Sequence, residues 1–133
     1  MTDDFGLSDE QRELILKILY TAQKSIEQVA VFGSRAQGKH RPNSDLDLVL
    51  YGSADEVVCD RLWTLFHESL LPFAVDVVSY STITYAPLRT HIDAVARPLF
   101  IHTEQGLVVY DKSTMRLSHP LRLPCRNCSL LEE

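Results

Sequence analysis

The chain has 133 residues, a formal net charge of −5 at pH 7, and hydrophobic and charged shares of 45% and 23%. This length allows one domain with a substantial core. The negative balance argues against a broad nucleic-acid-binding surface, so we expect no DNA partner. There is no run of about 18 apolar residues to cross a membrane, and the acidic start does not look like a signal peptide. We therefore expect cytoplasmic localisation and three reduced cysteines.

The first helix is predicted over residues 9–23. Ser8 and Gln11 form a capping box just before an apolar pattern with helical spacing. The apolar run Val29 to Phe32 then predicts the first strand.

Further elements follow the same two periodicities. A second capping box, Ser53 with Glu56, predicts a helix that contains Cys59 as a small buried side chain. A third helix is expected to be capped by Ser81 or Thr84. We expect strands at 44–51, 73–78 and 107–110, a short apolar return at 99–101, and the second helix at 54–69. The alternation predicts an α/β (α+β) fold with a small mixed sheet flanked by helices.

Two carboxylates stand inside the strand predicted at 44–51. Asp45 and Asp47 are two residues apart, so on a strand they project to the same face. Like charges that share a partly apolar site repel each other and lose hydration. A divalent cation is the usual reason for such an arrangement. The spacing therefore predicts a metal site.

A turn precedes these carboxylates. Gly33 ends the first strand and allows a sharp bend with close approach to a ligand, while Ser34 supplies a hydroxyl and neighbouring N–H groups. The basic loop 39–43, together with Arg35, could neutralise a triphosphate. His40 within it is expected to be a surface residue, because no partner ligand lies at a suitable spacing.

This stretch resembles the signature of DNA polymerase β-like nucleotidyltransferases, and more narrowly that of the minimal nucleotidyltransferases found in toxin–antitoxin pairs with HEPN proteins. The resemblance covers roughly residues 8–101. The approach to Asp76, from 71 to 77, fits the third acidic position of the family. The other residues that carry the resemblance are Gly33, Ser34, Arg35, Gly38, Ser44, Asp45 and Asp47.

The resemblance implies a polymerase β-like fold and roles for particular residues. Asp45, Asp47 and Asp76 would be catalytic and would bind Mg²⁺, with two ions expected. The nucleotide, which we expect to be ATP, would be bound by Gly33, Ser34, Arg35 and Ser44. An acceptor hydroxyl would attack the α-phosphorus and pyrophosphate would leave.

The resemblance also implies a partner. Longer members of the superfamily carry a helical domain that grips the acceptor, and this chain has no room for one, so we expect a HEPN-type helical protein encoded beside it. The chain would act as an antitoxin that adds AMP to this partner, commonly at a tyrosine. Two alternatives stay open: a small-molecule nucleotidyltransferase of the aminoglycoside-resistance kind, working as a homo-oligomer, and a non-catalytic module that neutralises its partner by occlusion.

The last segment of the sequence is set apart from this pattern. We expect a nucleotidyltransferase domain over residues 1–110 and a flexible C-terminal tail over residues 111–133. The tail holds Cys125 and Cys128, which form one Cys-x-x-Cys pair. A single such pair is half a zinc site, and we assign it no function.

Overall fold

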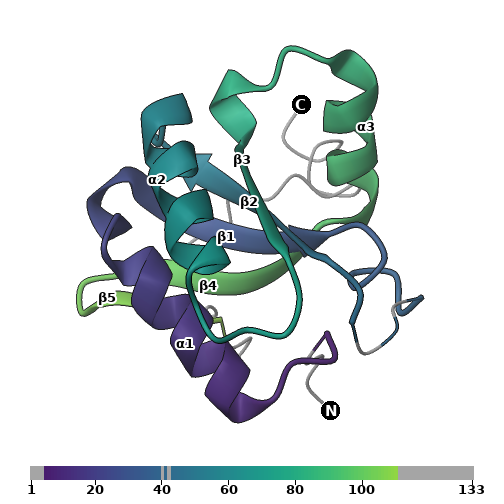
Figure 1. Cartoon of the computed structure of the whole chain (residues 1–133). Coiled ribbons are helices and arrows are strands. Elements are labelled where there is room, and N and C mark those ends of the chain that lie inside the picture. The colour runs from purple at the N-terminus through teal and green to yellow at the C-terminus, as the bar shows by residue number, and fades with distance from the viewer. Residues whose placement is uncertain (1–4, 40, 42, 111–133) are drawn as a thin grey trace.

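The computed structural model describes residues 5–39, 41 and 43–110. This part of the chain forms one five-stranded sheet with three α-helices and two short 3-10 turns (Figure 1). The elements in chain order are α1 (Asp9–Tyr20), a 3-10 turn (Gln23–Ser25), β1 (Ile26–Phe32), β2 (Leu46–Gly52), α2 (Glu56–His67), β3 (Val75–Ser79), a 3-10 turn (Tyr80–Thr82), α3 (Ala86–Val95), β4 (Arg97–Thr103) and β5 (Gly106–Val109).

The sheet is mixed, which confirms the predicted fold class. Its strand order is β3-β2-β1-β4-β5. Strand β1 is antiparallel to both β2 and β4, and β4 is antiparallel to β5, whereas β2 and β3 are parallel. Parallel neighbours need a crossover connection, and α2 provides it. Strands β2 and β3 therefore begin at the same end of the sheet.

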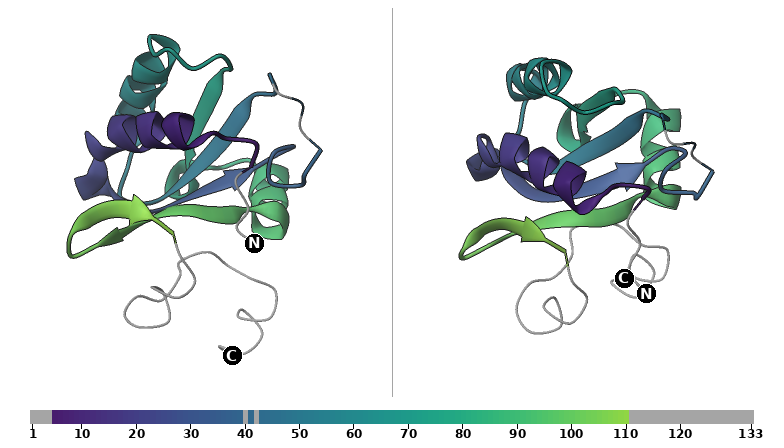
Figure 2. Two further views of the ribbon diagram at one scale, coloured as in Figure 1. Left: turned by 90° about the horizontal axis from the view of Figure 1, so that it is seen from below. Right: turned by 60° about the horizontal axis from the view of Figure 1, so that its bottom comes forward.

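Helices cover both faces of the sheet. Helices α1 and α2 pack on one face and α3 packs on the other (Figures 1 and 2). Alternation along β2 sends Leu46, Leu48 and Leu50 into the α1/α2 core, while Val49 and Tyr51 join the α3 core. Burial on both faces explains why β1 and β2 read as nearly continuous apolar runs.

The predicted start of the second helix was wrong. Asp55 is the N-cap of α2, and its carboxylate accepts a hydrogen bond from the backbone N–H of Val58. Ser53 does not cap the helix, because the backbone N–H groups of Ser53 and Ala54 both bond the carbonyl of Ser25 and hold the chain against the 3-10 turn before β1. Helix α2 therefore starts two residues later than expected.

The first helix starts as predicted and ends early. The capping box is present, with the side chains of Ser8 and Gln11 each accepting a hydrogen bond from the other residue's backbone N–H. The C-cap is Thr21, and the side-chain oxygen of Gln23 accepts a hydrogen bond from the backbone N–H of Leu107. This link to β5 diverts the chain before the predicted end at residue 23.

Other expectations meet the structure in part. Strand β1 begins three residues before the predicted position, at Ile26. Cys59 is buried and free, as expected. In the part of the chain that the structure describes, no helix is long and apolar enough to cross a membrane. His40 and the tail with Cys125 and Cys128 lie outside the described residues, so the proposed boundary at residue 110 stays a prediction.

Candidate active site

Two of the predicted carboxylates lie side by side on neighbouring strands. Asp47 is the second residue of β2 and Asp76 is the second residue of β3, and the two are direct partners in the parallel register. Residues at matching positions of adjacent strands point to the same face. That face is the one covered by α3, because Val49 and Tyr51, two and four residues beyond Asp47, belong to the α3 core. Asp47 is half-buried and Asp76 is exposed.

The third carboxylate joins this pair from a loop. Asp45 was predicted to lie on the strand, but β2 begins at Leu46, so Asp45 stands just outside it and is exposed. Asp45 still acts electrostatically on Asp47. The structure therefore brings the three acidic residues into one neighbourhood, although only Asp47 and Asp76 are held by strand pairing.

The electrostatics of the site centre on Asp47. Burial raises the pKa of its carboxyl from 3.8 to about 6, and repulsion from Asp76 and Asp45 adds to the shift, while His91 opposes it. A raised pKa means that the site disfavours its own negative charge. A bound cation would remove this penalty.

Gly33 forms a cradle for the Asp47 carboxylate. It follows β1 directly and has φ of +77°, a conformation that side chains disfavour. A Cβ built on Gly33 would overlap Oδ2 of Asp47. A side chain at position 33 would therefore displace the carboxylate from its position beside the turn.

The residues present fit Mg²⁺ in their chemistry. Three carboxylates supply the hard oxygen ligands that this ion prefers, and the Gly33 cradle and the raised pKa of Asp47 both favour a cation at this place. Within the described ranges, however, no three acidic, histidine or cysteine side chains are arranged to hold a metal ion by themselves. Asp45, Asp47 and Asp76 as metal ligands stay a prediction.

The turn after β1 has the form of a short helical turn. The backbone N–H of Gln37 bonds the carbonyls of Gly33 and Ser34, and the N–H of Lys39 bonds the Ser34 carbonyl. N–H groups at the start of such a turn have no acceptor within it and suit an anionic ligand. Ser34 is half-exposed at this start. The turn thus places the predicted phosphate-binding residues Gly33 and Ser34 next to Asp47.

Arg35 and Ser44 make hydrogen bonds within the protein, and their predicted part in nucleotide binding stays a prediction. The Arg35 side chain is 1% exposed, and its guanidinium donates hydrogen bonds to the backbone carbonyls of Phe5 and Ser44. It also lies over the ring of Phe73, 4.4 Å from its centre. The Ser44 hydroxyl accepts a hydrogen bond from the backbone N–H of Arg41. These contacts give Arg35 and Ser44 a part in holding the loop between β1 and β2.

His91 was not anticipated from the sequence. It lies on α3, and its ring packs edge-on against Phe32, with the ring centres 6.2 Å apart. Phe32 is the strand partner of Asp47. A single exposed histidine on a helix carries no sequence signal of its own, so only the packing of α3 on the sheet shows that it faces the site.

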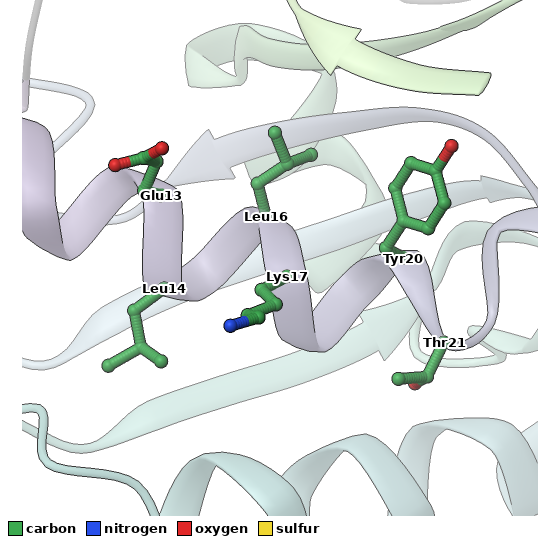
Figure 3. A pocket seen from close by; sticks show the side chains of 6 residues that line it. All are labelled: Glu13, Leu14, Leu16, Lys17, Tyr20 and Thr21. Carbon is green, nitrogen blue, oxygen red and sulfur yellow. The ribbon is translucent and has the colours of Figure 1, made fainter. Parts of the chain in front are cut away.

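A separate hollow lies along α1, away from these residues. It has a volume of about 620 Å³. Figure 3 shows side chains projecting from both flanks of the helix around it. Its lining residues are Glu13, Leu14, Leu16, Lys17, Tyr20 and Thr21. None of the predicted site residues lines it, and its one acid and one base form no group with evident chemistry. The candidate site remains the end of the sheet at Asp47.

Comparisons with known proteins identify the family of the chain. The family model described as "Polymerase beta, Nucleotidyltransferase" matches residues 13–105. Over 56 residues the chain is 43% identical to a Haemophilus influenzae protein described as "Probable protein adenylyltransferase MntA". The aligned region covers 41% of this chain and 49% of that protein. The chain thus spans about half the length of this curated relative.

Solved structures share the fold. One described as a toxin–antitoxin with AMP-PNP aligns with a TM-score of 0.57 at 23% identity, over 71% of this chain and 75% of that chain. Another, described as the toxin–antitoxin MntA–HepT, aligns with a TM-score of 0.52 at 17% identity, over 68% of this chain and 70% of that chain. At these identities the likeness shows the fold alone.

The Gly33 cradle can be tested with two matched glycines. Gly33→Ala and Gly38→Ala impose similar backbone strain of about 1 kcal/mol, since φ is +77° and +73°, but a Cβ at Gly38 meets nothing within 4 Å. We expect Gly33→Ala alone to weaken Mn²⁺ binding, measured calorimetrically as a substitute for Mg²⁺, by about tenfold or more. Equal binding by the two variants would show that the cradle does not position Asp47.

Asp47→Asn tests the charge penalty. In the wild type, the free-energy cost of ionising Asp47 in the folded state is absent below pH 3.8 and complete above about pH 6. The free energy of unfolding therefore falls as pH rises through that window. Without metal at pH 7.5, we expect Asp47→Asn to raise the melting temperature by about 4 °C, and the gain to shrink as pH falls toward 4. Calorimetric melts check this, with Asp60→Asn on the exposed side of α2 as the control. A gain independent of pH would contradict the electrostatic cause.

Arg35→Lys separates a structural role from phosphate binding. Lysine has one charged nitrogen and cannot reproduce the forked contacts to Phe5 and Ser44 together with the stacking on Phe73. We expect a loss of about 2 kcal/mol in the free energy of unfolding, measured in urea, while Arg41→Lys in the same loop loses little. Unchanged stability with impaired phosphate binding would restore the role first expected for Arg35.

Proposed function

Since this chain belongs to the polymerase beta nucleotidyltransferase family, we propose that it is a Mg²⁺-dependent protein adenylyltransferase that acts as an antitoxin. It transfers AMP from ATP to a hydroxyl, expected on a tyrosine, of a HEPN-type helical partner protein. The observation that carries the proposal is the side-by-side placement of Asp47 and Asp76 next to the Gly33 turn.

The three acidic residues have different roles in this proposal, according to their positions. Asp45 and Asp47 would hold Mg²⁺, which would neutralise phosphate charge and stabilise the attacking and leaving oxygens. Asp76 is exposed on β3, the edge strand of the sheet, where an incoming group can reach it. Its carboxylate orients the acceptor hydroxyl and takes its proton.

The turn after β1 binds the other end of the nucleotide. Backbone N–H groups at the start of the turn, near Gly33 and Ser34, bind the β- and γ-phosphates. The acceptor oxygen then forms a bond to the α-phosphorus, the bond from this phosphorus to the bridging oxygen breaks, and pyrophosphate leaves. Positioning and charge stabilisation account for the catalysis, because the protein forms no covalent bond itself.

Arg35 and Ser44 support this site from behind. The buried guanidinium ties the carbonyl of Ser44, the residue before Asp45, to the N-terminal segment at Phe5. Burial lowers the pKa of the Arg35 guanidinium, and the nearby Asp45 carboxylate partly offsets that shift. In this proposal Arg35 positions Asp45 and does not touch the nucleotide.

The descriptions of similar proteins support the proposed partner and nucleotide. The Haemophilus influenzae relative is described as a probable protein adenylyltransferase, and one structural neighbour is described as a complex with AMP-PNP, an ATP analogue. Other neighbours are described as MntA–HepT toxin–antitoxin complexes, including variants with aspartates changed to glutamate and with a tyrosine changed to alanine. Together these descriptions support ATP as the nucleotide and a HepT-like toxin as the acceptor.

Transfer of AMP to the partner is the direct test. The full-length chain, the helical protein encoded beside it, Mg²⁺ and labelled ATP are incubated together. Mass spectrometry then measures the mass added to the partner. We expect one or more AMP groups with the wild type and a rate at least about 100-fold lower with Asp47→Asn or Asp76→Asn. Asp60→Asn serves as the matched control and should retain the wild-type rate.

Neutralisation of the toxin separates this function from its alternatives. If the Asp45→Ala, Asp47→Ala double variant still silences the partner in full, occlusion explains the antitoxin effect and the transfer proposal fails. If the wild type consumes ATP with a hydroxylated small molecule and leaves every protein partner unlabelled, a small-molecule nucleotidyltransferase function replaces the proposed transfer to a protein.

A further inference from the structure

His91 lies on α3 near the acidic residues of the candidate site. Helix α3 turns Ile92 fully into the core, whereas the preceding residue His91 is exposed. The His91 ring lies against Phe32 at an interplanar angle of 78°. Phe32 pairs with Asp47 across the strands and immediately precedes Gly33. The imidazole is therefore placed near the Asp47 carboxylate, at the end of β1 that leads into the turn.

Electrostatics and hydrogen bonding agree with this placement. His91 attracts the Asp47 carboxylate, against the repulsion from Asp45 and Asp76. Among the described residues no hydrogen bond or ion pair involves the nitrogens of His91, in contrast to His102, whose Nδ1 lies 2.9 Å from the carbonyl oxygen of Ile26. The His91 nitrogens are thus available at a place where the proposed substrate brings phosphate oxygens.

We propose that His91 is a nucleotide-binding residue whose imidazole N–H donates a hydrogen bond to a phosphate oxygen of the bound triphosphate. This inference rests on the proposed function, because it needs a nucleoside triphosphate at the Asp47 site. It adds a contact from α3 to those proposed for the turn at Gly33 and Ser34. His91 then helps to hold the phosphates while the acceptor arrives at Asp76.

Two substitutions separate this contact from simple packing. His91→Phe keeps an aromatic ring against Phe32 and removes the N–H, whereas His91→Ala removes both. Loss of a hydrogen bond to a charged group corresponds to roughly tenfold in affinity or more. His67→Ala is the matched control, since His67 is an exposed histidine on α2, across the sheet, and stacks on Trp63 with ring centres 5.0 Å apart.

The experiment is calorimetric titration of each full-length protein with Mg²⁺ and AMP-PNP, without the partner. We expect both His91 variants to bind about tenfold more weakly than wild type, and His67→Ala to bind within twofold of it. A second titration with Mg²⁺ and inorganic tripolyphosphate should show the same loss, because this probe has phosphates and no adenosine. Circular dichroism checks that each variant is folded.

Each outcome decides the inference. Wild-type affinity in His91→Phe overturns it, whether or not His91→Ala is impaired, since packing alone then explains the residue. A loss with AMP-PNP that is absent with tripolyphosphate also overturns it, because the contact would lie on the adenosine. If the wild type itself binds neither probe, the proposed function fails as well. If the wild type binds both probes and His91→Phe binds them with the same affinity, only the role of His91 is disproved and the proposed function stands.

Discussion

The placement of Asp47 and Asp76 opposite each other on paired strands is the constraint on which the site depends. Parallel pairing of β2 and β3 fixes the two carboxylates opposite each other, and the pKa of Asp47 rises to about 6 as burial and repulsion act together. Strand β2 offsets this electrostatic cost through its opposite face, where Leu46, Leu48 and Leu50 are fully buried. The core under α1 and α2 thus stabilises an arrangement that the carboxylates alone would disfavour.

A second constraint fixes the loop that carries Asp45. Arg35 is buried at its centre and bonds the carbonyls of Phe5 and Ser44 while its guanidinium lies over Phe73. These partners come from the N-terminal segment, the loop itself and the approach to β3. One planar cation therefore connects the segments on either side of the carboxylates. The loop needs this tie because Asp45 lies outside β2 and has no strand pairing.

The sequence allowed the local elements and the acidic residues to be predicted, because both depend on neighbours a few positions apart. Capping signals identified the start of α1 and the apolar pattern identified β2, whereas the metal-binding role that the Asp-x-Asp spacing predicts for Asp47 stays a prediction. Partners far apart in the chain could not be foreseen. Arg35 bonds Phe5, 30 residues away, and nothing in the sequence near Arg35 indicates that contact. His91 faces the site through packing of α3, and Ser53 fails as a cap because Ser25 binds its N–H.

The two faces of the sheet differ in what covers them. Helices α1 and α2 cover one face over the larger core, whereas α3 lies on the other face (Figure 2). Asp76, on the edge strand β3, is exposed. An exposed acid at a sheet edge also discourages unwanted strand pairing. The exposed position of Asp76 suits the acceptor-binding role proposed for it, because an incoming hydroxyl can reach its carboxylate at this edge of the sheet.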